Sequence, residues 1–487
     1  MKAKITADEI YSRLEDFEAA ARALHHEDYA IMRDFWIGGH NALRHIHKHQ
    51  RETDQHWRER RKRLVGANYT RPIIDKIARV EYGGHVVRRL GDPELQARWD
   101  AAAAANKVGT FQLRTARQRG IDGCCIVQLY WDEAAGRVRW QHVLPEHFLP
   151  VVLPGDNYDE ISAVIIDRQL AADQTAPRHR VREDEPSPPS GARATRRVEI
   201  YTPEEVGVWI DGRKVEGKAL RWWERQAQYG CLPFVIFNGP LLVGDVLGYS
   251  LARGIVEINH FINRHLSNLS EIIDYQAFSL LVVKMGLSGM PLDADGRPLV
   301  DVGADKFLMV GEGGDAHFIS PQPKISEILD VLDRMIGVMY ETGSVPVAAV
   351  QPQQSHAESG VSRQIQFMPL RDLVKELQTQ DIESERELVA KTLLLEAVHR
   401  GERLNYEDAL ERTADLQVVY PETYHPVDEA SRVELYMARR EARLESRRMQ
   451  LRREHPELSD EAIAALEAQI DDDLRREAEA AVFPPSD

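Results

Sequence analysis

Two carboxylates, Asp293 and Asp295, stand directly before Gly296 in the sequence DADG. A metal-dependent nuclease uses paired carboxylates of this kind to hold a divalent cation near the scissile phosphate. Such an enzyme also needs a further acidic residue and a lysine on nearby strands. Aspartate and glycine are equally typical of tight turns. The pattern therefore favours a hairpin turn and leaves the nuclease as an alternative.

His45 and His49 are four residues apart, which would place both imidazoles on one face of a helix. Such a pair binds zinc when further cysteine, histidine or carboxylate ligands join it. No ligand pattern of that kind accompanies these two residues in the sequence. We therefore predict a solvated polar helix here and no metal site.

A group of aromatic residues lies near the middle of the chain, and aromatic rings can stack on nucleic-acid bases. The same residue types fill protein cores and interfaces, and we favour that packing role. The group comprises Trp222, Trp223, Tyr229 and Phe234.

The common catalytic motifs are missing from the sequence. It holds no GxxxxGK[ST] phosphate loop, no HExxH and no GxSxG elbow. Gly311, Gly313 and Gly314 do not follow the GxGxxG spacing and indicate a turn. The three cysteines are too few for a disulfide framework and indicate buried, reduced thiols. The sequence therefore predicts no enzyme, no cofactor and no metal.

The composition is that of a globular protein, with 43% hydrophobic and 29% charged residues in 487. This length suggests about three or four structural units. Apolar stretches such as 278–283 are too short to span a bilayer, and the N-terminal residues lack the apolar core of a signal peptide. We expect an intracellular, soluble protein. The net charge of −16 argues against tight nonspecific DNA binding over the whole surface.

The first half of the chain predicts helices followed by a β-rich region. Thr6 and Glu9 form a capping-box pattern, and helices are expected over 7–65, 68–89 and 92–118. A β-hairpin is expected from 124–132 and 137–144, because both runs are rich in strand formers and a short turn separates them. Four further strands are expected at 161–170, 196–202, 205–211 and 232–238. The Pro-rich stretch 171–195 predicts a mobile excursion within this region.

The second half predicts long helices around a small β segment. Apolar residues recur at helical spacing from 246 to 275 and again from 324 to 342. Strands are expected between these helices at 279–285, 305–310 and 315–320. A loop at 343–360, a long helix over 361–400 kinked at Pro369, a strand at 415–422 and a helical tail to 481 complete the chain. The fold class is α+β.

The helical tail is charge-segregated. Residues 432–453 hold eight arginines and three glutamates, whereas residues 454–487 hold two arginines and eleven acidic residues. One interpretation is a solvated helical hairpin with complementary halves. The other is a contact in which the basic segment of one copy meets the acidic segment of the next.

The apolar stripes on 255–273 and 325–339 cannot all be buried by two helices and a small β cap. Copies of the same helices arranged in a ring would cover them most simply. At this point the sequence resembles the portal proteins of tailed bacteriophages, over roughly residues 68–426. Six motifs in order carry the resemblance: NYTRPIIDKIARVEYG (68–83), RGIDGCCIVQLYWDE (119–133), LPFVIFNG (232–239), GYSLARGIVEINHFINRHLS (248–267), ISPQPKISEILDVLDRMIGVMYETGSVP (319–346) and ESGVSRQIQFMPL (358–370).

The resemblance implies a portal-type fold with an α/β wing, a two-helix stem, a small α/β clip and a helical C-terminal crown. It also implies a ring of twelve subunits. Carried onto this chain, the regions are an N-terminal helix (1–24), wing (25–244), stem helix (245–275), clip (276–323), second stem helix (324–342), tunnel loop (343–360), wing completion by a long kinked helix and late strand (361–425) and crown (426–487). The polar N-terminal helix and the insertion at 171–195 depart from a minimal portal.

The resemblance implies a head-tail connector at one capsid vertex, through which double-stranded DNA is packaged and ejected. The implied partners are further copies of the chain, the terminase large subunit, the major capsid protein, scaffold, and a head-completion or adaptor protein. ATP hydrolysis belongs to the terminase motor. The implied location is the virion, with assembly in the host cytoplasm and no membrane association. Another head-tail adaptor ring protein stays open as an alternative, beside the nuclease.

An acidic channel wall repels phosphates, so contact with DNA is expected to be local. Lys324 and Arg334 on the second stem helix are weaker candidates, with salt bridges to Asp330 or Glu327 as the alternative. The tunnel-loop candidates are Gln351, Gln353, Gln354, Ser355 and His356, whose amides, hydroxyl and imidazole can bond phosphates transiently.

Overall fold

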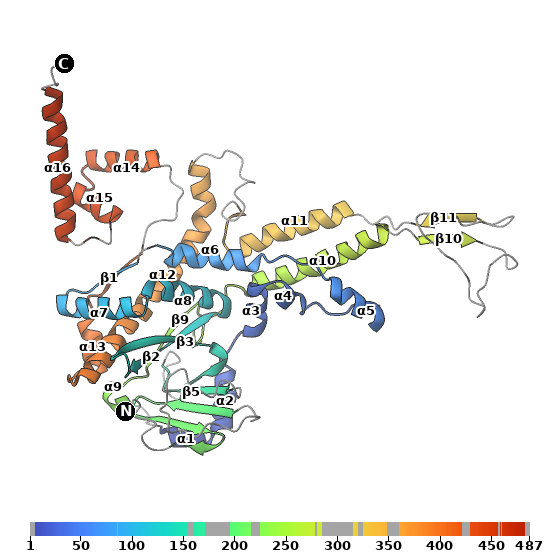
Figure 1. Ribbon diagram of the computed structural model, residues 1–487, viewed down its shortest axis with the longest axis horizontal. Coiled ribbons are helices and arrows are strands. Elements are labelled where there is room, and N and C mark those ends of the chain that lie inside the picture. Colours follow the sequence, from blue (N-terminus) through green and yellow to red (C-terminus); the bar gives the residue numbers. More distant parts are fainter. Residues whose placement is uncertain are drawn as a thin grey trace. The chain divides into compact units, whose positions relative to one another are not determined.

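The computed structural model describes residues 5–482 of the 487-residue chain, apart from several gaps. The residues outside the description are 1–4, 85, 154–159, 171–194, 216–224, 278–279, 285–314, 320–324, 348–359, 421–428, 456–457, 459 and 483–487. The described part combines helices with small antiparallel sheets, which confirms the α+β class (Figure 1). None of the described helices has both the length and the apolar composition of a membrane span.

The chain forms two compact units. Unit 1 comprises Met1–Trp36, Tyr69–Val256 and Tyr340–Asp487. Unit 2 comprises Ile37–Asn68 and Glu257–Met339. Each unit therefore joins segments that are far apart in the sequence.

The predicted β-hairpin is confirmed as part of a three-stranded sheet in unit 1. Strands β2 (Cys124–Asp132), β3 (Arg137–Val143) and β9 (Phe234–Asn238) lie in the order β3-β2-β9. Helices α7 (Pro93–Ala105) and α12 (Gly360–Arg400) pack against it. Apolar side chains from both helices and the sheet form one core there. It includes Trp99, Val127, Leu129, Trp140, Val235, Leu388 and Leu394.

A five-stranded sheet forms the second layer of unit 1. Its order is β4-β5-β6-β7-β8. The strands are β4 (Phe148–Val151), β5 (Ala163–Leu170), β6 (Thr195–Tyr201), β7 (Val206–Ile210) and β8 (Arg213–Lys214). Helices α1 (Ala7–Ser12) and α2 (Leu14–Arg22) contact this sheet. The predicted capping box of Thr6 and Glu9 is confirmed at the start of α1.

The prediction of one helix over residues 68–89 is wrong at its C-terminal end. Helix α6 (Thr70–Tyr82) stops early, and β1 (Val87–Arg89) pairs with β12 (Gln417–Val419). Because that partner lies more than 300 residues further along the chain, local periodicity could not reveal it. Helix α8 (Val108–Asp122) then packs beside α6 and leads into β2.

Six further described helices are short or rich in charged residues. They are α3 (Tyr29–Ile37), α9 (Gln226–Tyr229), α13 (Tyr406–Arg412), α14 (Glu429–Glu441), α15 (Arg447–Glu454) and α16 (Asp460–Val482). Arg447 on α15 forms a 2.5 Å ion pair with Asp471 on α16. This contact joins the basic and acidic halves of the tail within one chain, as the hairpin interpretation predicts.

Unit 2 contains the short helices α4 (His40–Leu43), α5 (Asp54–Arg60) and η1 (Arg61–Arg63), together with most of α10 (Arg253–Ala277) and α11 (Ile325–Thr342). Strands β10 (Leu280–Lys284) and β11 (Asp315–Ile319) pair antiparallel between these two long helices in the sequence. Both long helices were predicted, although α10 begins at Arg253 and not near 246. The predicted strand at 305–310 lies outside the described residues.

Candidate functional site

The residues predicted to face a DNA channel lie mostly outside the described part of the chain. Arg334 is the exception. It lies on α11, is exposed, and forms no ion pair with any residue that the structure describes, so the alternative pairing with Asp330 or Glu327 is not seen. The undescribed candidates are Lys324, Gln351, Gln353, Gln354, Ser355 and His356.

Helix α11 has apolar side chains on more than one face. Leu332 and Met339, seven residues apart, are buried within the chain. Val331 and Val338 are also seven apart, yet they are 50% and 37% exposed. Leu329 is 44% exposed and stands nine residues before Val338, which places these two side chains about 180° apart around the helix. Apolar side chains therefore remain uncovered on two opposite flanks of α11.

The charged face of α11 borders the flank formed by Val331 and Val338, because Arg334 stands three residues after Val331 and four before Val338. Glu327, Asp330 and Arg334 are all exposed, and their spacing of three and four residues puts them on one side of the helix. This side lies opposite the buried Leu332 and Met339, because Asp330 and Leu332 differ by about 200° around the axis. The helix thus has a buried face, an exposed apolar residue at Leu329 on one flank, and on the opposite flank Val331 and Val338 beside a charged face with more acidic than basic residues.

Helix α10 holds an extended segment through a strip of polar residues. Asn259, Asn263 and Ser267 are buried and recur every four residues, so they share one face. The Asn263 side-chain oxygen accepts from the Ala67 amide at 2.8 Å, and Asn259 donates to the Ala67 carbonyl at 2.9 Å. The Ser267 hydroxyl donates to the Val65 carbonyl at 2.7 Å. Residues 65–67 are thereby fastened along α10.

Three glycines in unit 1, Gly123, Gly239 and Gly248, form a close backbone contact that we call the glycine junction. The Gly239 amide donates to the Gly123 carbonyl at 2.6 Å. Gly123 has a φ of +84°, and a Cβ atom there would lie 2.3 Å from the Gly248 carbonyl oxygen. No side chain fits at that distance. The backbone packing therefore requires glycine at this position.

The glycine junction joins the end of α8 to the segment that starts α10. The Ser250 hydroxyl donates to the Ile121 carbonyl at 2.5 Å, and the Ala252 amide donates to the Gly120 carbonyl at 3.2 Å. Three of the six sequence motifs, those around Gly123, Gly239 and Gly248, therefore meet at one place. The motifs are structural, because each supplies the close backbone approach that fixes the first residues before α10.

A buried ionic network connects α12 to α6, α8 and β1. Arg119 on α8 pairs with Asp381 on α12 at 2.6 Å and with Glu81 on α6. Arg88 on β1 pairs with Glu385 on α12 at 2.6 Å. All five side chains are almost fully buried. The Tyr82 hydroxyl, also buried, donates to Asp381 at 2.8 Å, and Gln112 donates to Glu385 at 2.8 Å.

The network contains three carboxyl groups but two guanidinium groups. Ionising all three acids would leave an uncompensated negative charge in a site that water does not reach. Burial accordingly raises the pKa of Glu81 to about 8, and the nearby Asp381 carboxylate acts in the same direction. The network is close to neutral when Glu81 holds a proton.

This proton gives a pH dependence that can be measured. A carboxyl whose pKa is raised in the folded state stabilises that state at low pH and loses the contribution as the pH rises, here between 4.5 and about 8. The free energy of unfolding should fall across this window, by at most about 1.4 kcal/mol for each pH unit. Urea denaturation at pH 5.5 and 8 should show a smaller difference for Glu81→Gln than for the wild type. The exposed control Glu133→Gln should keep the wild-type difference, and an unchanged Glu81→Gln profile would contradict the assignment.

The remaining candidates for chemistry do not assemble into a site. Among the residues that the structure describes, no three His, Cys, Asp or Glu side chains gather around a position for a metal ion. The prediction that His45 and His49 share a helix is wrong, because α4 ends at Leu43 and neither residue is helical. The residues of the nuclease alternative, Asp293 and Asp295, lie outside the description.

The aromatic and cysteine predictions are confirmed where the structure describes them. Tyr229 and Phe234 are buried in the cores beside the sheets, while Trp222 and Trp223 lie outside the described residues. All three cysteines are buried and form no disulfide: Cys124, Cys125 and Cys231.

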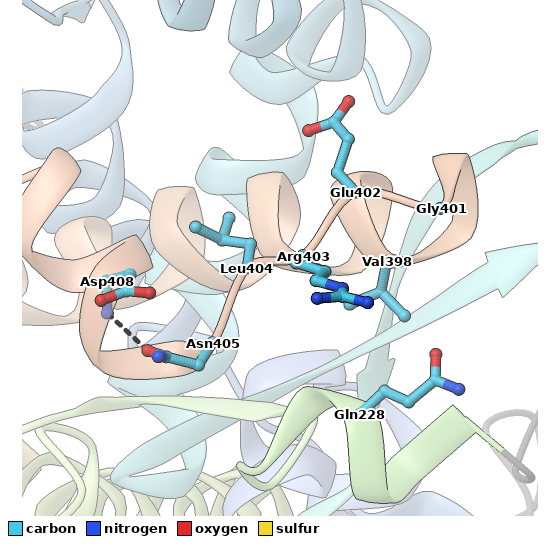
Figure 2. Close-up of a pocket in the computed structure, with 8 residues that line it drawn as sticks. All are labelled: Gln228, Val398, Gly401, Glu402, Arg403, Leu404, Asn405 and Asp408. Carbon is cyan, nitrogen blue, oxygen red and sulfur yellow. Dashed lines mark hydrogen bonds between the residues drawn. The ribbon is translucent and has the colours of Figure 1, made fainter.

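A hollow of about 440 Å³ lies at the turn between α12 and α13, and Figure 2 shows the residues that line it. Arg403 and Glu402 line it, together with Asn405 and Asp408. The Asn405 side chain caps α13 by accepting from the Asp408 amide at 2.7 Å. The Glu402 carboxylate pairs with Arg98 on α7 at 3.1 Å, and the residues that line the hollow include no Ser, Thr, Cys, Lys or His that could act as a nucleophile.

The sequence matches no family model and no curated protein. Among the solved structures that resemble the chain, three share 11% sequence identity with it. One is a chain from the neck of a native GTA particle computed with C12 symmetry. The match covers 77% of this chain and 87% of that chain, with a TM-score of 0.43. Another is a chain from the virion of a native gene transfer agent (GTA) particle. The match covers 88% of this chain and 94% of that chain, also with a TM-score of 0.43. The third is a chain from the neck of an empty GTA particle computed with C6 symmetry. The match covers 79% of this chain and 89% of that chain, with a TM-score of 0.46. All three TM-scores are below 0.5, so no property is transferred from them.

Proposed function

We propose that this chain is a portal subunit that assembles into a ring around a DNA channel at one vertex of a phage-like capsid. The observation that carries the proposal is the pair of uncovered apolar flanks on α11. A head-to-tail ring brings two different faces of each subunit against its two neighbours. Val331 and Val338 would meet one neighbour, and Leu329 on the opposite flank would meet the other.

The order of the elements supports the same proposal. The described parts of the six portal-like motifs fall on regular structure: α6, the α8–β2 connection, β9, α10, α11 and the first turns of α12. They also lie in the sequence order that the portal resemblance requires. Between α10 and α11 the chain contributes the β10–β11 pair, to which the proposal assigns the role of the clip.

In the proposed ring, the charged face of α11 would line the channel. Glu327 and Asp330 would repel the DNA backbone, and the exposed Arg334 would supply an intermittent attraction. The tunnel-loop residues Gln351, Gln353, Gln354, Ser355 and His356 would bond phosphates transiently. The ring would itself hydrolyse nothing.

The other portal properties belong to the proposal as well. The clip would seat the large terminase subunit during packaging and a head-completion or adaptor protein afterwards. Scaffold and the major capsid protein would place the ring, with the twelve subunits that the portal resemblance implies, at its vertex in the host cytoplasm. The finished ring would remain in the virion.

Electron microscopy of the purified chain, with native mass measurement, tests the proposal. We expect rings with a central hole for the wild type. The double variant Val331→Gln and Val338→Gln should stay folded but lose the ring, because polar amides at an apolar interface are poorly satisfied. The control Asp330→Asn removes a charge from the same helix, about 80–100° around its axis from the two valines, and should keep the ring. A wild type that remains monomeric, also with scaffold present, would overturn the proposal, as would magnesium-dependent nicking of plasmid DNA.

A further inference from the structure

A short basic segment stands out in unit 2 of this acidic chain. Residues 44–63 hold eight arginines and lysines against three acidic residues, while the whole chain carries a net charge of −16. Four histidines lie in the same stretch. The segment includes α5 and η1 and precedes residues 65–67, which α10 holds through its polar strip.

One arginine of this segment has a structural role. The Arg60 side chain is 9% exposed and pairs with Glu52 at 2.9 Å. It also donates to the Asn268 side chain on α10 at 2.9 Å and lies over the Trp57 ring. Thr53 caps the start of α5 by accepting from the His56 amide. The segment is therefore folded against α10 by a few residues, to which Arg63 adds an exposed ion pair with Asp274 on α10 at 3.3 Å.

The remaining basic side chains face solvent. Arg51 and Arg61 are exposed and form no ion pair with any described residue. Arg58 is exposed and donates to the Asp54 main-chain carbonyl. Lys62 pairs with Glu59, with both side chains more than 60% exposed. Arg58 lies in the last turn of α5, and Arg61 and Lys62 lie in the 3₁₀ turn η1 that follows directly, so the three exposed side chains are close together; we call them the basic face.

Cations at a helix C-terminus stabilise the helix dipole, which offers a purely structural explanation. That effect falls off within the last turn and is worth a fraction of a kcal/mol at an exposed site. Stabilisation of the helix dipole does not require several cations on one face. It also does not explain Arg51, which lies before the start of α5. A surface that concentrates positive charge in an acidic protein instead fits a ligand with regularly spaced negative charges.

We propose that the basic face binds the phosphate backbone of double-stranded DNA, outside the channel and without sequence preference. Duplex DNA carries one negative charge per about 1.7 Å of its axis, so several arginines on one face can each meet a phosphate. The guanidinium groups would donate paired hydrogen bonds to phosphate oxygens. This inference rests on the proposed function for its biological setting: the surface would hold DNA against the outside of the ring.

The test uses the full-length protein and covalently closed circular duplex DNA, which cannot thread through a closed ring. The variant Arg58→Gln, Arg61→Gln and Lys62→Gln removes three positive charges and keeps good helix formers. The matched control Arg13→Gln, Arg475→Gln and Arg476→Gln also removes three charges, from side chains that are 67–72% exposed in unit 1. Binding is measured by mobility shift between 50 and 200 mM salt, with thermal melting as the check that each variant is folded.

We expect the basic-face variant to bind closed circles at least about tenfold more weakly, and its salt dependence to decrease by about 0.9 in log–log slope per lost phosphate contact. The control should bind like the wild type. Equal binding by both variants, or no binding by the wild type, would overturn the inference. So would binding of an acidic protein but not DNA through the same residues. Rings without basic-face-dependent binding would leave the proposed function intact, whereas such binding without rings would remove the portal proposal and keep the DNA site.

Discussion

Replacing Gly123 by alanine should destabilise unit 1 severely, by about 3 kcal/mol or more. A non-glycine residue in a left-handed conformation costs about 1–3 kcal/mol, and Gly123 has a φ of +84°. The new methyl group would also lie 2.3 Å from the Gly248 carbonyl oxygen and 2.7 Å from the Ser250 amide nitrogen. Both neighbours are backbone atoms, so the contact can be relieved only by separating the segments of the glycine junction.

Chemical denaturation followed by circular dichroism measures this effect, and Gly401→Ala is the matched control. Gly401 has nearly the same φ, +83°, but a Cβ atom there would meet no atom within 4 Å. The control should show the conformational cost alone, about 1 kcal/mol. Similar denaturation midpoints for the two variants would show that the close backbone approach does not govern stability at Gly123.

The second large effect is expected for Arg119→Leu. Arg119 is the shared cation of Glu81 and Asp381, and its side chain is 1% exposed. Removing one partner of a buried ion pair typically costs about 3–5 kcal/mol, because the opposite charge stays buried without compensation. Adding Glu81→Gln and Asp381→Asn to the same chain should recover part of the lost stability, because the amides that replace the two carboxyl groups carry no charge.

A second arginine, Arg386 on α12 itself, provides the control for Arg119. Arg386 pairs with Glu383 at 3.1 Å, but Glu383 is 75% exposed. Exposed ion pairs contribute about 0–1 kcal/mol, so Arg386→Leu should change the denaturation midpoint little. If Arg119→Leu were equally mild, the buried network would not be what fastens α12 to α6 and α8.

Periodicity and turn chemistry predicted the elements whose information is local. The hairpin of β2 and β3 follows from strand formers flanking a short turn, and α11 follows from its apolar stripe. The end of α6 was missed because β1 gains its strand identity from pairing with β12. The short strand β4 was also missed, since Pro150 lies inside it and proline usually argues against a strand.

The residues that hold the structure together were harder to predict. Glu81, Arg119 and Asp381 are charged residues on three separate helices, and each would ordinarily be expected at the surface. The signals that could have revealed more were present in two places. Three of the motifs contain a glycine, at positions 123, 239 and 248, and the density of basic residues in 44–63 contrasts with the acidic chain.

Pro369 divides α12 mechanically. Proline has no amide hydrogen, so the carbonyl of Ile365 lacks its usual partner within the helix. Ile365 and Met368, before the proline, are exposed, whereas Leu370, Val374 and Leu377, after it, are buried. The helix therefore bends most easily where its support begins. A sideways force on the first two turns of α12 would therefore rotate them about Pro369. The part of the helix after Pro369, which buried side chains hold in place, would move little.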